Sequence, residues 1–165
     1  MKVAIEVERS INIAAPHQKV LTLMQDLETT IRRFPKLRRL RKVGEKAYVW
    51  EMDAIGSRIA NISHEVVYGA KYTVDATRGL LSWKPLPNEG NATIEGAFRM
   101  KDLGGETRLT FSVKGELRDL PVPLIYRLVA PPFIQGKFMR LVEIFLENTA
   151  AAIGMSEDQV AASRA

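Results

Sequence analysis

The first residues of the chain alternate between apolar and polar positions. From residue 3 to residue 13, apolar side chains fall on one side of an extended chain, and charged or small polar side chains fall on the other. A period of two predicts a β-strand with one face in the core. The apolar positions of this face are Val3, Ile5, Val7, Ile11 and Ile13.

The next pattern is helical. Pro16 suits the first turn of a helix, and apolar residues recur at helical spacing from Val20 to Leu27. A second short helix is expected to end near Pro35, because the residue before a proline avoids the helical region. We therefore expect two short helices within residues 16–34, which cap one mouth of a sheet.

Residues 37–118 have the pattern of strands separated by compact turns. Six turn signals divide this range into about seven pieces, so either one piece continues a strand or the sheet is large. The signals are Gly44-Glu45-Lys46, Gly56-Ser57, Gly69-Ala70, Arg78-Gly79, Pro87-Asn88-Glu89-Gly90 and Gly104-Gly105. Alternation assigns an inward face to Tyr48, Trp50, Met52, Ala54, Ala60, Ile62, Val66, Tyr68, Ile94, Phe98, Met100, Leu109, Phe111 and Val113.

The chain closes with a long apolar helix within residues 123–154. Pro131 and Pro132 separate an earlier turn at residues 124–130 from the main stretch, either as a kink or as a break between two helices. Its apolar face comprises Ile134, Phe138, Leu141, Val142, Phe145, Thr149 and Ala152. Residues 155–165 are polar and alanine-rich, and we expect them to form a flexible tail.

This order of elements is typical of a curved antiparallel sheet wrapped around its last helix. We predict an α+β fold with about seven strands, two short helices after the first strand and a single domain over residues 1–154. A sheet and a helix in this arrangement tend to enclose a space. The pattern therefore suggests a container for a small apolar molecule.

Composition agrees with one core. Of the 165 residues, 46% are hydrophobic, and cysteine is absent, which excludes disulfides, thiolate metal sites and cysteine nucleophiles. We expect neither a metal nor a cofactor. The N-terminus alternates charged and apolar residues where a signal peptide needs an apolar block, and no stretch reaches about 18 apolar residues. We therefore expect a soluble, cytoplasmic protein.

The layout resembles a known superfamily. Residues 28–35 (ETTIRRFP), the strand of residues 91–100 and the closing segment of residues 121–154 are similar to the START-like helix-grip (SRPBCC) superfamily. Within it the chain looks closest to the polyketide cyclase/dehydrase and lipid-transport branch, which includes the coenzyme Q-binding proteins. The resemblance covers residues 3–154 and is architectural, so it transfers no functional residue. It implies a seven-stranded sheet that grips a C-terminal helix around a cavity for lipids, quinones, sterols or polyketides.

The walls of such a cavity follow from the inward faces. Rigid rings beside flexible methionines accommodate varied apolar guests, although ordinary core packing gives the same periodicity, and only the resemblance favours a pocket. The candidate cavity residues are Tyr48, Trp50, Met52, Ile62, His64, Tyr68, Phe98, Met100, Phe111, Ile134, Phe138, Leu141 and Phe145. The turns at Gly56-Ser57 and at residues 85–90 are candidate lids.

Two polar residues on inward faces are candidate ligand anchors. His64 could orient a ligand carbonyl or act as a general base, or it could hydrogen-bond a tyrosine or water. Arg9 could meet a ligand anion, pair with a carboxylate, or escape through a bulge. Catalytic motifs are absent from the sequence, so binding or transport is favoured. A cyclase or dehydratase stays open as the alternative, because a shaped, dry pocket can drive such reactions.

A basic stripe offers a different class of function. It comprises Arg32, Arg33, Lys36, Arg38, Arg39, Arg41 and Lys42, on a chain of net charge +5. Such a stripe could dock on anionic lipid, meet RNA phosphates on a ribosome, or be a plain solvated surface. Phe34 is the one aromatic residue inside it, so we expect no sequence-specific binding of nucleic acid.

Overall fold

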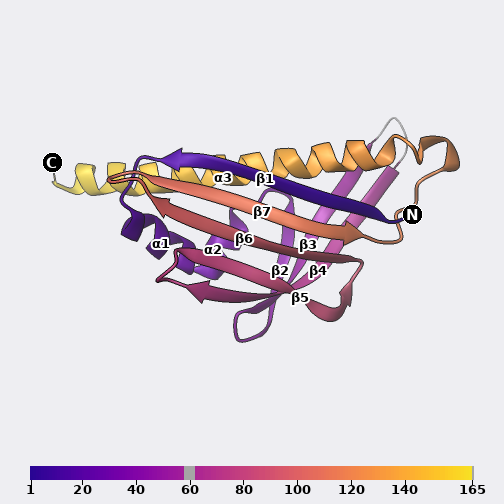
Figure 1. Cartoon of the computed structure of the whole chain (residues 1–165), viewed down its shortest axis with the longest axis horizontal. Coiled ribbons are helices and arrows are strands. Elements are labelled where there is room, and N and C mark those ends of the chain that lie inside the picture. The colour runs from indigo at the N-terminus through magenta and orange to yellow at the C-terminus, as the bar shows by residue number, and fades with distance from the viewer. Residues whose placement is uncertain (58–61, 165) are drawn as a thin grey trace.

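The computed structural model describes the backbone of residues 1–57 and 62–164. It describes the side chains of residues 1–54 and 64–153. Figure 1 shows a curved sheet with one long helix lying along it. The elements are β1 Val3–Ile13, α1 His17–Gln25, α2 Leu27–Arg32, β2 Leu37–Gly44, β3 Ala47–Ser57, β4 Ile62–Asp75, β5 Leu80–Gly90, β6 Ala92–Asp102, β7 Thr107–Leu117, the 3₁₀ turn η1 Leu124–Tyr126, and α3 Ala130–Arg164.

The seven strands form one antiparallel sheet in the order β1-β7-β6-β5-β4-β3-β2. The predicted α+β fold, with two short helices after the first strand and a long C-terminal helix, is confirmed. One edge, β1, is covered by α3, whose Gln135 side chain hydrogen-bonds both the N–H and the carbonyl of Glu6. The helix thereby satisfies backbone groups that an edge strand leaves unpaired.

The predicted turn at Gly69-Ala70 is wrong, because both residues lie inside the continuous strand β4. Here β5 leaves register, so that Tyr68 pairs with Gly90 and Ala70 with Pro85. A Cβ atom on Gly69 would lie 2.8 Å from the Cβ of Leu86. The glycine therefore provides space for the bulged part of β5, and this strand continuation reduces the number of strands to seven.

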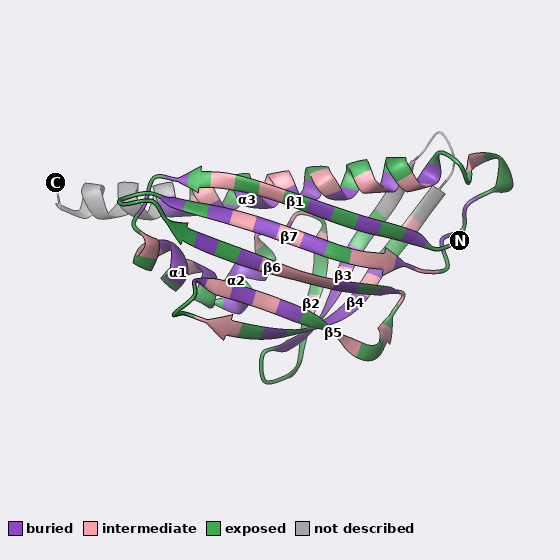
Figure 2. Ribbon diagram, viewed as in Figure 1, coloured by how far each residue is buried: buried purple, intermediate pink, exposed green. Residues whose placement is uncertain are grey.

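Burial alternates along the strands, as Figure 2 shows for β1, β7 and β6. The predicted inward residues of β6 and β7 are buried, and so is the apolar face of α3 from Ile134 to Thr149. Ala54 is an exception and is exposed, because β3 shifts register between Met52 and Ile55. Ala60 and Ile62 have side chains outside the described residues.

Helices α1 and α2 are attached to the carboxyl-terminal half of α3 through Arg33. Its Nε donates to Thr149 Oγ1 at 3.1 Å, its Nη2 donates to Thr30 Oγ1 at 3.1 Å, and its carbonyl accepts from Asn148 Nδ2 at 2.9 Å. The guanidinium lies 5.9 Å from the centre of the Phe145 ring. Arg33, which the sequence grouped with the basic surface, therefore faces inward. Burial lowers its pKa to about 10, although the Asp26 carboxylate acts in the opposite direction.

The amino end of α3 lies at the other end of the sheet from α1 and α2 (Figure 1). Pro131 and Pro132 occupy the first turn of α3, where a proline removes no hydrogen bond, so they begin the helix rather than kink it. The turn η1 precedes α3 in the chain and is a separate element. The helix continues to Arg164, and the predicted flexibility of residues 155–165 stays a prediction.

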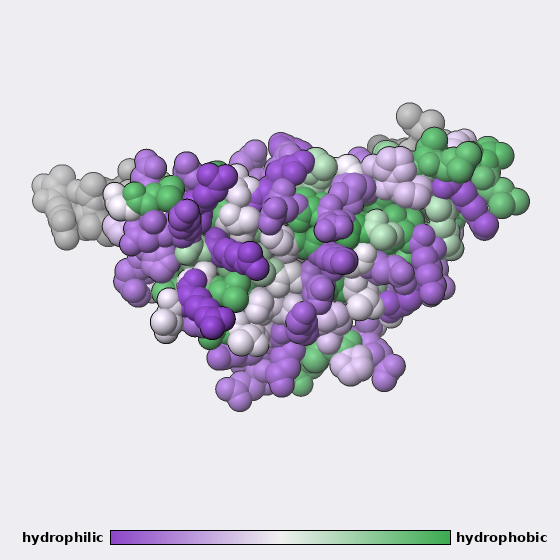
Figure 3. All heavy atoms as spheres, viewed as in Figure 1, coloured by the Kyte–Doolittle hydropathy of each residue, from purple (hydrophilic) through white to green (hydrophobic). Residues whose placement is uncertain are grey.

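Hydrophobic residues gather at this end of the molecule, over the segment that leads into α3 (Figure 3). Leu124, Ile125 and Leu128 are 76, 80 and 93% exposed. Buried side chains flank them on both sides, at Val122 and Ala130. The segment is therefore anchored at its two ends and exposed in its middle.

Replacing Arg33 by alanine is expected to lower the free energy of unfolding by about 2 kcal/mol, because hydrogen bonds from a charged group contribute roughly 1.5–3 kcal/mol. Denaturant unfolding of R33A measures this change. The neighbouring exposed residue supplies the control, and R32A should change stability by less than about 0.5 kcal/mol. Equal effects of the two variants, or a more stable R33A, would mean that the cost of burying the charge exceeds the value of its hydrogen bonds.

Candidate ligand-binding site

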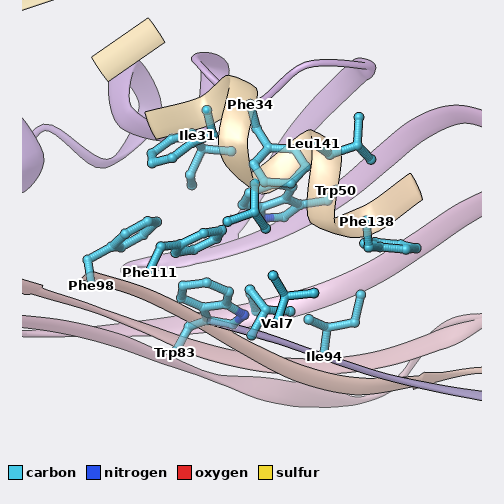
Figure 4. Close-up of a cluster of buried hydrophobic side chains, with 14 of the residues drawn as sticks. Val7, Ile31, Phe34, Trp50, Trp83, Ile94, Phe98, Phe111, Phe138 and Leu141 are labelled. Atoms are coloured by element: carbon cyan, nitrogen blue, oxygen red, sulfur yellow. The ribbon is translucent and has the colours of Figure 1, made fainter. Parts of the chain in front are cut away.

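A cluster of aromatic side chains fills the space between the sheet and α3 (Figure 4). Phe98 of β6 and Phe111 of β7 are partners in the sheet register, which places their rings side by side on the inner face. The rings stack at 4.4 Å between centres, and both meet Phe145 of α3 at 5.2 and 5.3 Å. Strand pairing thus assembles the sheet's half of the cluster, and the helix closes it.

The other half of the cluster comes from β3, β4 and the segment that follows α2. Trp50 stacks on Tyr68 at 5.1 Å, because the two residues pair directly across β3 and β4. Phe34 meets Trp50 edge-on at 5.5 Å and lies 6.2 Å from Phe111. Phe34 therefore links the short helices to both halves of the aromatic cluster.

A cavity remains at the centre of this cluster, with a volume of about 10 Å³. A space of that size holds about one water molecule. It is lined by Val7, Phe34, Trp50, Met52, Tyr68, Trp83, Ile94, Phe111, Val113, Phe138 and Val142. This cavity is thus much smaller than the container for a small apolar molecule that the sequence suggested.

Three buried neutral polar groups around the cluster have no hydrogen-bond partner among the described residues: Trp50 Nε1, Trp83 Nε1 and the hydroxyl of Tyr72. Leaving such a group unsatisfied costs about 1–3 kcal/mol. Both indoles line the cavity, and Tyr72 packs on Trp83 at 5.5 Å. Unpaired neutral donors therefore lie beside an apolar wall, which suits a ligand that carries an acceptor oxygen.

Two of the buried tyrosines, Tyr68 and Tyr72, stay protonated over the physiological range. Burial raises the pKa of both Tyr68 and Tyr72 well above the usual value of 10.0. The indole of Trp50 acts in the opposite direction on Tyr72, but the two groups do not reach hydrogen-bond geometry. Both hydroxyls are therefore able to donate a proton in a hydrogen bond and are poorly suited to act as bases.

The structure places the predicted cavity residues in two groups. The predicted residues that line the cavity are Trp50, Met52, Tyr68, Phe111 and Phe138. The predicted residues that are buried elsewhere in the core are Tyr48, Phe98, Met100, Ile134, Leu141 and Phe145. The side chain of Ile62 lies outside the described residues, and so does the candidate lid at Gly56-Ser57.

Several lining residues were absent from the prediction. Ile94, Val113, Val142 and Val7 were assigned to inward faces but not to the cavity wall. Trp83 could have been found, because it alternates with Leu81 along β5. Phe34 had no such signal, since it lies in the irregular segment after α2, where no periodicity applies.

His64 lies in a polar network away from the cavity wall. Asn91 Nδ2 lies 3.1 Å from His64 Nε2 and donates to the carbonyl of Glu65 at 2.7 Å, while Asn91 Oδ1 accepts from the N–H of Val67 at 2.9 Å. Burial is the main cause that lowers the pKa of His64, and a hydrogen bond to the backbone of Arg118 opposes it. The arrangement ties β4 to the turn between β5 and β6.

Arg9 adopts one of the alternatives that the sequence left open, the ion pair. Its Nε lies 3.7 Å from Glu143 Oε1 of α3, and its Nη1 donates to the carbonyl of Glu8 at 2.8 Å. The side chain is 41% exposed. It therefore bridges β1 and α3 at the rim of the sheet.

The basic stripe is interleaved with carboxylates. Arg38 forms a bidentate pair with Glu65, with one N–O distance of 2.9 Å, which raises the pKa of Arg38 and lowers that of Glu65. Arg39 and Arg41 lie 3.6 and 3.4 Å from Glu51. These residues lie on or beside β2, the uncovered edge strand, where charged side chains discourage pairing with another chain. Arg32, Lys36 and Lys42 are exposed.

Two further features bear on function. Among the side chains described by the structure, no group of three or more His, Cys, Asp or Glu residues could hold a metal ion. No helix in the described ranges is long and apolar enough to cross a membrane.

Comparison with solved structures finds similar folds. The Zhui aromatase/cyclase of Streptomyces sp. R1128 matches with a TM-score of 0.67 and 15% identity, over 92% of this chain and 94% of that one. A START superfamily protein of Mycobacterium smegmatis matches with a TM-score of 0.65 and 14% identity, over 91% and 97%. A norcoclaurine synthase of Thalictrum flavum, solved with a transition-state analogue, matches with a TM-score of 0.62 and 12% identity, over 95% of this chain and 98% of that one. The sequence itself matches no family model and no curated protein.

At such low identity the similarity concerns the fold, and it does not single out the coenzyme Q-binding branch that the sequence suggested. It agrees with the seven-stranded sheet, the two short helices after β1 and the long helix α3. The protein thus has the START-like helix-grip fold.

Proposed function

We propose that the protein binds a small, largely apolar molecule between the sheet and α3, and that this molecule carries at least one acceptor oxygen. The observation that carries the proposal is the pair of buried indole N–H groups of Trp50 and Trp83, which have no hydrogen-bond partner among the described residues and belong to two residues that line an apolar cavity. Buried donors are rarely left unpaired, since each costs about 1–3 kcal/mol. A ligand carbonyl or ether oxygen would satisfy them.

Binding in this cavity requires the aromatic cluster to open. The cavity of about 10 Å³ has no room for an organic molecule, so rings such as Phe34 and Phe138 have to move aside. The backbone of α3 lies mainly along β1 and meets the middle of the sheet through side chains. A rotation of a few aromatic side chains would therefore enlarge the space without breaking strand pairs.

The class of ligand is a ring-containing molecule such as a quinone or a polyketide-like compound. Flat rings fit between the rings of the wall, which already pack at 5.1–6.2 Å between centres. Proteins with the same fold include an aromatase/cyclase and a norcoclaurine synthase, and these names support a guest of this kind. Neutral donors in the wall favour a neutral oxygen over a carboxylate.

A cyclase is the second candidate, and the similar aromatase/cyclase fold favours it. Such an enzyme would hold a reactive chain in a shaped, dry pocket and polarise a carbonyl with neutral donors. A general base is harder to assign. Tyr68 and Tyr72 stay protonated, and His64 is held by Asn91 outside the wall. Binding without chemistry is therefore the first candidate.

Replacing Trp83 by phenylalanine keeps a ring but removes one donor, so it tests the hydrogen bond directly. W83F should bind a water-soluble naphthoquinone about fivefold more weakly than the wild type, because a net hydrogen bond contributes about 1 kcal/mol. The affinity for methylnaphthalene, which has no acceptor, should stay within about twofold. The chain has two tryptophans, both in the wall, so quenching of tryptophan fluorescence reports on this site, with Trp50 left in the variant.

Thermal unfolding of W83F provides the control for folding. Binding of neither compound by a folded wild-type protein would overturn the proposal. An equal loss for both compounds would show that shape, and not the donor, determines binding.

The environment of His64 predicts a dependence of stability on pH. Burial lowers the pKa of His64 below its usual 6.5, so below that pH the unfolded chain binds more protons than the folded one. The stability from neutral His64 is present above pH 6.5 and is lost as the pH falls through the folded pKa. The free energy of unfolding of the wild type should therefore fall relative to that of H64Q over this range. A difference that is constant with pH would contradict this expectation.

A further inference from the structure

Five large apolar side chains protrude at one end of the molecule, just before and at the start of α3. We call this group the apolar tip; it comprises Leu124, Ile125, Leu128, Val129 and Phe133, which are 76, 80, 93, 58 and 37% exposed. The other exposed large hydrophobic residues of the described chain, Val43 and Leu103, stand far apart in the sequence at 47 and 42%. Clustered exposure of this kind marks an interaction site.

The tip is held in a defined conformation. The N–H of Tyr126 donates to the carbonyl of Pro123 at 2.9 Å, and the N–H of Val129 donates to the carbonyl of Tyr126 at 3.1 Å. Farther along, the N–H of Phe133 donates to the carbonyl of Val129 at 3.2 Å, which joins the tip to α3. The exposed side chains are therefore presented by hydrogen-bonded turns rather than by an irregular loop.

The segment that carries the tip is also connected to the body of the protein. Leu120, Val122 and Ala130 are buried on either side of it. The N–H of Leu120 donates to the carbonyl of Met1 at 3.0 Å, and Arg127 Nε donates to the carbonyl of Val122 at 3.4 Å. These contacts fix where the tip points relative to the amino end of α3.

Within the segment that carries the tip, between Asp119 and Glu143, the charged residues have one sign. Residues 120–142 contain Arg127, Lys137 and Arg140 and no Asp or Glu. Arg140 pairs with carboxylates later in α3, whereas neither Arg127 nor Lys137 makes an ion pair with any residue that the structure describes. Lys137 Nζ lies 5.3 Å from the centre of the Phe133 ring, so a cation sits next to the apolar side chains.

We propose that the apolar tip inserts into the surface of an anionic lipid bilayer. Aliphatic and aromatic side chains that enter the boundary between headgroups and acyl chains, with basic residues beside them, match both parts of such a surface. The tip is convex, and a fluid bilayer accommodates a convex shape, whereas a globular partner needs a matching groove. The basic stripe around β2 contributes less to the attraction of an anionic surface, because three of its arginines are paired with Glu51 and Glu65.

This surface lies at the amino end of α3, which is the end opposite α1 and α2 (Figures 1 and 3). Docking there would place one end of the space between sheet and helix against the lipid. The inference rests on the exposed residues alone, and it stands whether or not the aromatic cluster binds the ligand proposed above.

Vesicle flotation tests the proposal. The wild type should float with vesicles of phosphatidylcholine mixed with phosphatidylglycerol, and more weakly with phosphatidylcholine alone or at high salt. The variant I125Q/L128Q should bind the mixed vesicles at least about tenfold more weakly, since each buried aliphatic side chain contributes about a factor of ten or more. The matched control V43Q/L103Q removes two exposed apolar residues elsewhere and should bind like the wild type.

A site-specific label supplies a second measurement. The chain has no cysteine, so L128C can be labelled uniquely with a dye whose emission shifts on entering an apolar environment. The dye at L128C should shift with mixed vesicles, whereas the dye at V43C should not. The absence of wild-type flotation, or equal flotation of I125Q/L128Q, would overturn the proposal. Concentration-dependent dimers that I125Q/L128Q abolishes, without any vesicle binding, would assign the tip to a second copy of the chain instead.

Discussion

The fold depends on aromatic packing across the gap between a curved sheet and the helix that it grips. The curvature keeps the middle of the sheet away from the backbone of α3, so large side chains must fill the space. Phe111 occupies the centre, within 6.2 Å between ring centres of Phe34, Trp83, Phe98 and Phe145. Because protein interiors pack as densely as organic crystals, this cluster holds β5, β6, β7, α3 and the end of α2 in fixed relation.

The same packing gives the interior its chemical character. Rings with polar edges bring N–H and O–H groups into the interior, and three of these groups lack hydrogen-bond partners among the described residues. A core built only of aliphatic residues would avoid that cost. The packing of the rings therefore stabilises the cluster, and the unpaired N–H and O–H groups at the ring edges lower its stability. A core of aliphatic side chains would lack this second effect.

The two ends of the molecule differ in how they are closed. At one end α1 and α2 are fixed to α3 by the hydrogen bonds of Arg33 with Thr149 and Asn148. At the other end, η1 and the first turn of α3 carry exposed apolar residues beside Arg127 and Lys137. Opening the interior at the first end would thus break these hydrogen bonds. At the second end it would involve a segment with exposed apolar side chains.

Local periodicity was enough to locate the elements and the faces that they bury. The alternation in residues 3–13 and the helical spacing in residues 134–149 report directly on which side chains leave water, and burial follows these patterns. Other features depend on contacts between elements. Gly69 was mistaken for a turn because a glycine that admits a neighbouring strand looks the same in sequence as one that bends the chain. The inward turn of Arg33, the placement of Phe34 and the small volume of the cavity depend on contacts between residues distant in sequence, and local periodicity carries no information about the space that remains between two packed layers.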